Sequence, residues 1–195
     1  MGDTALRSKP GAHGDDAGSR PSRLRVRAAG RSPTMHGNFD ARDLRRAMGG
    51  FATGVTVVTA CAPAGRRAGV TVNSFCSVSL DPPLVLWCLG KRAPSLPVFS
   101  AASHFAIHVL AADQGALSVR FSRPAADKFA GLQYDEGLGD VPLLDGAAVR
   151  FECRREHSYE SGDHLILIGR IERYCYSECT PLLFHGGRMH ASDDE

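Results

Sequence analysis

The sequence lacks any segment that could cross a membrane as a helix. No run of about 18 apolar residues occurs, and the N-terminus has no apolar core of the kind found in signal peptides. The usual phosphate-binding loops are missing too, because no G-x-G-x-x-G pattern follows a strand-like run and no G-x-x-x-x-G-K-[ST] pattern is present. We therefore expect a cytoplasmic protein with no membrane partner, which binds any nucleotide through some other arrangement.

Motifs for hydrolysis and for metal binding are equally scarce. The G-x-S-x-G pattern of a serine hydrolase is absent. His104 and His108 have a spacing found in metal sites, but they lie in a strand-like run without a neighbouring carboxylate, so we interpret them as structural and predict no metal site. Asp163 and His164 are adjacent in the chain, and we expect this to be a poor geometry for one to orient the other.

The six cysteines are never spaced as C-x-x-C. Several of them lie in apolar, strand-like runs. A disulfide framework or a zinc site would bring cysteines together at short spacings, whereas scattered apolar positions are typical of buried thiols in a reducing compartment.

Charge is distributed unevenly along the 195 residues. Residues 1–35 carry seven Lys or Arg and three Asp, although the whole chain has a formal net charge of only +2, so residues 36–195 are slightly acidic. The basic stretch is also poor in large apolar side chains. We interpret residues 1–35 as a disordered tail or as sequence upstream of a true start at Met35, with a transit peptide as the alternative. Residues 36–195 are expected to form one folded domain with no charge-based reason to bind nucleic acid.

The folded part alternates strand-like runs with short turns. Strands are predicted over 53–61, 70–80, 84–90, 104–111, 147–161, 164–177 and 181–190. Short helices are predicted over 39–51, 94–102 and 113–121. Residues 62–69 are expected to form a turn that joins the first two strands, and residues 131–146 to be irregular. Many strands with only brief helices between them predict a mainly β, antiparallel barrel.

The first helix has signals at both of its ends. Asp40 is placed to cap the N-terminus, and Gly49 is placed to end the helix. Between them, Leu44 and Met48 fall at helical spacing with Phe51 beyond, which predicts one apolar face.

Two stretches carry polar residues that suggest a ligand site. The strand-like run VTVNSFCSVS (70–79) is unusually rich in Ser, Thr and Asn, whose short side chains can donate to ligand oxygens and ring nitrogens and let a flat ring approach the backbone. Cross-strand Ser/Thr pairing at a sheet edge explains the same pattern. In SGDH (161–164), His164 opens another strand, where it can contact a ligand or simply be half exposed.

Several motifs occur in order over residues 38–190. They are FATGVTVVTA, GVTVNSFCSVSLDPPLVLWCLGK, DKFAG, PLLDGAA, SGDHLILIGRI and PLLFHGGR. This set resembles the short-chain flavin reductase family, the NAD(P)H:flavin oxidoreductase components of two-component monooxygenases. The resemblance implies an FMN-binding split β-barrel and a homodimer. It also implies FMN or FAD as the flavin, NADH or NADPH as the hydride donor, and a separate monooxygenase that receives the reduced flavin.

The resemblance also implies which residues form the site. Residues expected to contact the flavin ring and ribityl chain are Thr53, Thr71, Val72, Asn73, Ser74, Ser77, Val78 and Ser79. Residues expected on the phosphate side are Cys88, Leu89, Gly90, Lys91, Lys128 and Phe129. His164 is expected to contact the nicotinamide.

Two departures from the family pattern leave details open. Arg92, Ala93 and Pro94 stand where the family often has serines, so the choice between FMN and FAD is open. Met189 stands where an aromatic residue is common, which puts a stacking role there in doubt.

Two other functions stay as alternatives. One is a split-barrel oxidoreductase that retains its flavin and acts on another acceptor or small substrate, and the other is a non-enzymatic binding module.

Overall fold

The computed structural model describes residues 35, 37 and 40–191. The predicted tail lies outside the described residues except for Met35, so its disorder stays a prediction. The strands are β1 (Thr53–Gly54), β2 (Thr56–Ala62), β3 (Arg66–Val72), β4 (Cys76–Leu80), β5 (Pro83–Gly90), β6 (His104–Val109), β7 (Tyr134–Glu136), β8 (Pro142–Leu144), β9 (Val149–Ser161), β10 (His164–Tyr176), β11 (Leu182–His185) and β12 (Arg188–Ala191). The helices are α1 (Ala41–Met48), α2 (Leu96–Ala101) and α3 (Gly115–Ser122), with 3-10 turns η1 (Pro63–Gly65) and η2 (Leu138–Asp140).

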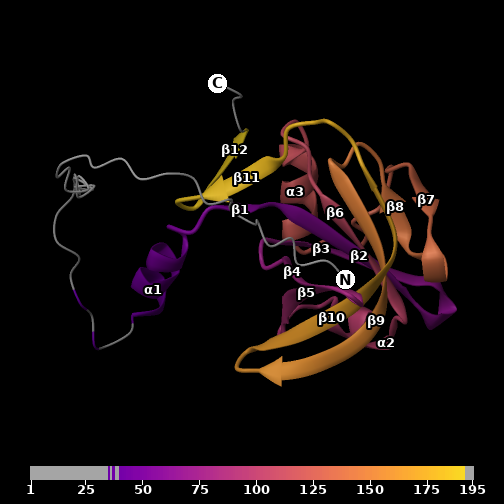
Figure 1. The fold of residues 1–195 in the computed structure, drawn as a ribbon, viewed down its shortest axis with the longest axis horizontal. Helices are drawn as coiled ribbons and strands as arrows, with labels where there is room; N and C mark the ends of the chain where they lie inside the picture. Colours follow the sequence, from indigo (N-terminus) through magenta and orange to yellow (C-terminus); the bar gives the residue numbers. More distant parts are fainter. Residues whose placement is uncertain (1–34, 36, 38–39, 192–195) are drawn as a thin grey trace, which may run out of the picture. The chain divides into compact units, whose positions relative to one another are not determined.

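The main sheet has seven antiparallel strands in the order β3-β2-β6-β9-β10-β5-β4 (Figure 1). Its two edge strands, β3 and β4, are consecutive in sequence and are joined only by the link 73–75. A flat sheet would place these edges roughly 29 Å apart, whereas so short a link spans no more than about 14 Å. The sheet must therefore curl round on itself, which confirms the predicted split barrel.

Several predicted element boundaries are wrong. The predicted turn 62–69 is a turn only over η1, because Arg66 already pairs with Ala62 and begins β3. The single strand predicted over 70–80 is interrupted at the link 73–75, where the chain passes from one sheet edge to the other. Residues 131–146, expected to be irregular, contain the β7–β8 pair.

The C-terminal strand predicted over 181–190 is instead the β11–β12 hairpin. It turns at Gly186 and Gly187, whose φ values of 59° and 82° lie in the left-handed region that favours glycine. β11 also pairs with β1, so these three strands form a small second sheet.

The core lies on both faces of β2, and every residue of this strand is buried. Inside the barrel, Trp87 is fully buried and makes edge-on contacts with Phe99 and Phe105, with ring centroids 5.0 and 5.8 Å apart. On the other face, Val57 packs in a second cluster that includes Phe121 of α3. Burial on both sides explains why the sequence of β2 lacks apolar and polar alternation.

His108 is a core residue that bridges three strands. Its Nδ1 donates to the carbonyl of Val57 over 3.1 Å, and its Nε2 accepts from the backbone N–H of Leu144 over 3.0 Å. Complete burial lowers the pKa of His108 to about 4, so the ring is neutral at pH 7. Because both ring nitrogens are occupied by backbone groups, the structural interpretation of His108 is confirmed.

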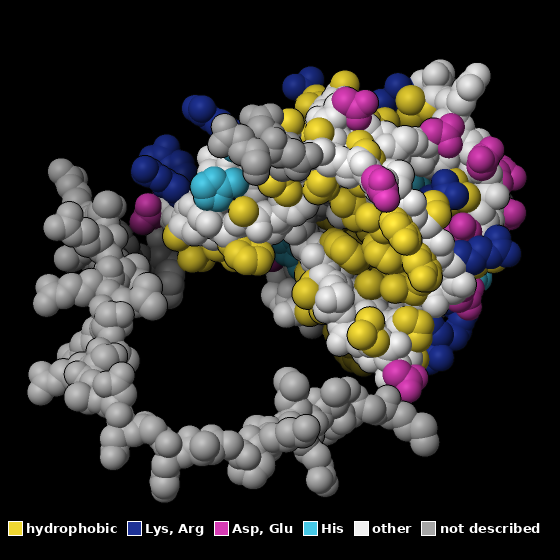
Figure 2. All heavy atoms as spheres, turned by 45° about the horizontal axis from the view of Figure 1, so that its top comes forward, with side chains coloured by type: hydrophobic (Ala, Val, Ile, Leu, Met, Phe, Trp, Pro, Cys, Tyr) yellow, Lys and Arg dark blue, Asp and Glu magenta, His cyan; other side chains and the backbone are white. Residues whose placement is uncertain are grey.

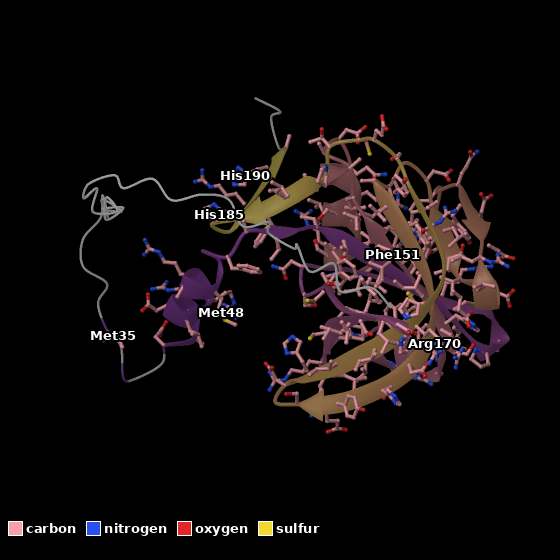
Figure 3. The ribbon with its side chains drawn as sticks, in the orientation of Figure 1. Met35, Met48, Phe151, Arg170, His185 and His190 are labelled. Carbon is pink, nitrogen blue, oxygen red and sulfur yellow. The ribbon has the colours of Figure 1, made fainter. Side chains whose placement is uncertain are left out.

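α1 forms within the predicted range 39–51, but its apolar face stays exposed in the described part of the chain. The side chain of Asp40 accepts from the N–H groups of Arg42 and Asp43, both over 2.9 Å, and so caps the helix. Leu44 is 44% exposed and Met48 is 68% exposed. Hydrophobic side chains reach the surface on the face drawn in Figure 2, and Figure 3 shows Met48 extending from α1.

Candidate functional site

A cavity of about 280 Å³ lies where the ends of β3 and β5 meet the start of β10. We call it the strand-end pocket. The predicted site residues that line it are Thr71, Val72, Asn73, Ser74, Cys88, Leu89, Gly90 and His164. Strand pairing explains this meeting, because β10 runs antiparallel to β5 with His164 opposite Gly90. The pocket therefore gathers residues from three strands that are separated by up to 94 positions in the sequence.

One ring nitrogen of His164 is hydrogen-bonded to Asp163, and the other is free. Its Nδ1 lies 2.6 Å from Oδ1 of Asp163, so we assign the proton to Nδ1, which donates to the carboxylate. The lone pair of Nε2 then remains available. This nitrogen lies close to Gly90, because a Cβ placed on Gly90 would stand 3.8 Å from it. The hydrogen bond and charge of His164 lower the pKa of Asp163.

This contact corrects the expectation that Asp163 is badly placed to orient its neighbour. Asp163 belongs to the tight β9–β10 turn, in which Gly162 has a φ of 56°, and His164 begins β10. The side chain of Asp163 is 94% exposed and outside the strand, so it can fold back onto the imidazole ring. The interaction is local to the turn, and strand alternation between adjacent residues does not prevent it.

Two of the short polar side chains near the pocket serve the scaffold. The hydroxyl of Ser74 accepts from the Cys88 N–H over 3.0 Å and lies 3.3 Å from the Cys88 carbonyl, which fastens the link 73–75 to β5. The hydroxyl of Thr71 donates to the Ser118 carbonyl of α3 over 2.7 Å. Asn73 differs, because its exposed amide has no hydrogen-bond partner among the residues that the structure describes.

Five predicted site residues line neither the strand-end pocket nor the larger cavity beside it that is described next. Ser77, Val78 and Ser79 belong to the edge strand β4. Thr53 pairs with Phe184 in the small sheet, and its buried hydroxyl has no partner within the described part of the chain. Nζ of Lys91 binds Glu160 over 2.9 Å. Their contact with a ligand stays a prediction that neither cavity supports.

A larger cavity of about 800 Å³, which we call the trough, adjoins the strand-end pocket. The two cavities have Val70 and Ala93 in common, so they lie next to each other. Phe129 lines the trough together with Lys128, whose Nζ donates to the carbonyls of Gly69 over 3.1 Å and Phe121 over 2.7 Å. An ammonium group has three donors, so one remains for a ligand. Burial lowers the pKa of Lys128.

Several trough residues were not predicted from the sequence. Arg66, Arg67 and Tyr134 line its far part. The paired arginines stand out in the sequence, but they were expected in a turn rather than on a strand beside a cavity. Ala93 of the strand-end pocket was also missed, because a small side chain gives no chemical signal.

The polar groups of the strand-end pocket, which include both hydrogen-bond donors and acceptors, suit a planar heterocycle with polar edges. Asn73 offers a free amide, and His164 offers a free ring nitrogen. Gly90 has no side chain to separate a ligand from the backbone, and Val72 supplies an apolar surface. Convergence of a few polar groups on a small apolar cavity is the usual form of a ligand site.

Comparison with known proteins gives consistent results. Residues 48–193 match the model of the flavin reductase like domain. The FMN reductase (NADH) SmoA of Agrobacterium fabrum is 50% identical over 151 residues, which are 77% of this chain and 86% of that protein. The structure of the NADH:FAD oxidoreductase SgcE6 of Streptomyces globisporus has a TM-score of 0.76 at 37% identity, covering 84% of this chain and 100% of that one.

A further relative is longer than this chain. The reductase component of the flavin-dependent trigonelline monooxygenase of Acinetobacter baylyi is 43% identical over 146 residues. The match covers 75% of this chain but 47% of that protein, so the chain spans about half of its length.

Proposed function

This chain belongs to the flavin reductase like domain family, and on that premise we propose that it is a flavin reductase that uses NADH to reduce FMN or FAD. The observation that carries the proposal is the strand-end pocket, where Asn73, Gly90 and His164 converge from three segments. The flavin, when bound, accepts a hydride from the nicotinamide and so supplies the redox chemistry.

The pocket residues position the two reactants. We assign Asn73 and the neighbouring backbone of Val72 to the flavin ring, whose polar edge needs donors and acceptors. His164 is assigned to the nicotinamide carboxamide, because its Nε2 can accept from an amide N–H while Asp163 fixes the ring from the other side. Hydride transfer needs orientation and a short distance rather than an acid or base, so no side chain is asked to move a proton.

Lys128 is assigned to the flavin phosphate. Its Nζ lies at the wall of the trough, next to the strand-end pocket, with one donor still free. A lysine there offsets phosphate charge. The lowered pKa of Lys128 reflects its burial, and a bound phosphate dianion would raise that pKa again.

The proposed partner is a separate monooxygenase. The Acinetobacter relative is named as the reductase component of a monooxygenase, and a reductase of this kind releases its reduced flavin to the oxygenase. Among the described residues, no helix is both long and apolar enough to cross a membrane.

We propose that the chain works as a homodimer. Leu80 on the edge strand β4 is 93% exposed, and Phe51 after α1 is 76% exposed. Exposed apolar side chains that gather at one place favour an interface between copies. Leu44 and Met48 on α1, with Phe51 just beyond it, are such a group.

Flavin binding tests the proposal directly. The purified protein is titrated with FMN and with FAD while flavin fluorescence is followed, and the Asn73→Ala variant is titrated in parallel. We expect saturable binding that weakens about ten-fold in the variant, as for the loss of one or two hydrogen bonds. A protein that keeps a yellow flavin through purification would instead support the bound-flavin alternative, and one that binds no flavin would contradict both.

A further inference from the structure

Arg120 of α3 binds the chain that forms one wall of the trough, although it does not itself line the cavity. Its Nε donates to the Lys128 carbonyl over 2.7 Å, and its Nη2 donates to the Ala130 carbonyl. Neither the trough nor the strand-end pocket has Arg120 in its lining. The guanidinium group therefore acts on the backbone behind the wall, where a charged donor makes a strong hydrogen bond.

The segment that Arg120 holds has little regular structure of its own. Residues 123–133 join α3 to β7 and belong to no helix or strand, and residues 124–129 of this segment line the trough. The ring of Phe129 anchors the segment in the core, where it packs on Phe121 with ring centroids 5.2 Å apart. Because the segment lies outside any helix or sheet, its backbone depends on side chains for hydrogen bonds. Arg120 supplies two of them.

Lys128 is held at both of its ends. Arg120 binds its backbone carbonyl, and its Nζ donates to the carbonyls of Gly69 over 3.1 Å and Phe121 over 2.7 Å. The acceptors of Nζ are neutral, and within the described part of the chain neither Lys128 nor Arg120 forms an ion pair with a carboxylate. A partly buried ammonium group whose charge is left unbalanced favours an anionic ligand at its third donor.

The position of Nζ depends on where the backbone of Lys128 lies. A hydrogen bond to a phosphate oxygen needs the two atoms to be about 2.7–3.2 Å apart, so a shift of roughly 1 Å at the ammonium group would lose it. Arg120 limits such a shift, because it fixes the carbonyl of Lys128 and also that of Ala130. Riboflavin has no phosphate, so its binding does not depend on this geometry.

We propose that Arg120 is a positioning residue that holds Lys128 for the flavin phosphate, and that the two together make the site select phosphorylated flavins over riboflavin. The inference rests on the proposed function, which assigns the phosphate to Lys128. Arg120 acts through Lys128 and does not touch the ligand. A purely structural role is the alternative, because a cation in the last turn of a helix is favourable in itself. That role would affect the binding of every flavin equally.

Flavin binding in the absence of NADH separates the two roles. The Kd values for FMN and riboflavin are measured from flavin fluorescence in the wild type, in Arg120→Gln and in Lys128→Met. We expect the FMN Kd to rise about ten-fold in Lys128→Met and about five-fold in Arg120→Gln, while the riboflavin Kd stays within about two-fold of the wild-type value. Arg173→Gln, which removes an exposed arginine from β10, is the control and should change neither. An equal rise for both flavins in Arg120→Gln, or no rise for either, would overturn the proposal.

A double variant decides the question even if riboflavin binds too weakly to be measured. If Arg120 acts through Lys128, adding Arg120→Gln to Lys128→Met should raise the FMN Kd by less than about two-fold. A further rise of about five-fold would show that Arg120 acts independently of Lys128, and would overturn the proposal.

A conservative variant keeps both tests usable if Arg120→Gln does not fold, which urea unfolding would show. Arg120→Lys keeps the charge but has no fork to bind two carbonyls at once. It then takes the place of Arg120→Gln, with a smaller rise of the FMN Kd and the same selectivity for FMN. Failure of the reductase function would appear separately, as no binding of either flavin to the wild type and no NADH oxidation with any flavin.

Discussion

His164 has one ring nitrogen that is hydrogen-bonded and one that is free at the strand-end pocket. Its Nδ1 is engaged by Asp163, and its Nε2 lies beside Gly90 at the strand-end pocket. A ring that is fixed on one side and free on the other can orient a ligand without exchanging a proton with it. In the proposed function the Asp163–His164 pair positions the nicotinamide, with His164 in contact with it and Asp163 acting through His164.

Replacing either member of this pair should affect the nicotinamide more than the flavin. In His164→Ala the KM for NADH should rise about ten-fold, as for one lost hydrogen bond, while the flavin Kd stays close to the wild-type value. Asp163→Asn should raise the KM for NADH by a smaller factor, because the ring stays but can rotate. Asp113→Asn, an exposed aspartate before α3, is the matched control. An unchanged KM in His164→Ala would remove this residue from the nicotinamide site.

His108 makes stability depend on pH. Its pKa is about 4 in the folded protein against 6.5 ordinarily, so below pH 6.5 the unfolded chain binds a proton that the folded chain does not. Stability should fall as pH drops from 6.5 to 4, by at most about 1.4 kcal/mol per pH unit. When the pH is lowered from 7 to 5, the free energy of unfolding measured with urea should fall by about 2 kcal/mol more in the wild type than in His108→Gln. Equal losses would contradict the assigned protonation state.

At the scale of elements, most of the strands and the N-terminal cap of α1 could be predicted from the sequence. β-branched and apolar runs predict β2, β5, β6 and β10 because their burial is visible in composition alone. The break between β3 and β4 was not predicted, because it depends on Ser74 binding Cys88 in a strand distant in sequence. Likewise, helical spacing indicates an apolar face on α1 but says nothing of what covers it.

The close packing of β10 against Phe105 of β6 and Cys153 of β9 depends on a glycine at position 169. A Cβ on Gly169 would stand 2.4 Å from Cζ of the buried Phe105 ring and 2.9 Å from Cβ of Cys153. Gly169→Ala should therefore lower the free energy of unfolding by about 1–3 kcal/mol through overpacking. Gly54→Ala is the control, since no atom lies within 4 Å of a Cβ there. Equal urea midpoints for the two variants would contradict this packing.

The exposed apolar face near α1 should control assembly. Phe51→Ser removes a large apolar side chain that is 76% exposed in the single chain. We expect the dimer Kd, measured by analytical ultracentrifugation, to rise at least about ten-fold, whereas Arg46→Ser on α1 should leave it nearly unchanged. A variant that dimerises as tightly as the wild type would show that copies associate through another surface.

At the scale of the whole molecule, curling of the sheet is what creates the site. β3, β5 and β10 reach the strand-end pocket only because the barrel brings the two sheet edges together. The family resemblance was enough to predict most of the lining residues. It could not predict that Ser74 and Thr71 would bind the scaffold, or that the trough would reach Arg66, because both depend on contacts between distant segments.

In the proposed function, the strand-end pocket brings NADH and a diffusible flavin together. The most direct test follows the NADH absorbance band with purified protein, first alone and then with added FMN or FAD. We predict that NADH is oxidised through many turnovers only when flavin is added. NADH oxidation that does not respond to added flavin, or no oxidation with FMN, FAD or riboflavin, would contradict the proposed flavin reductase function.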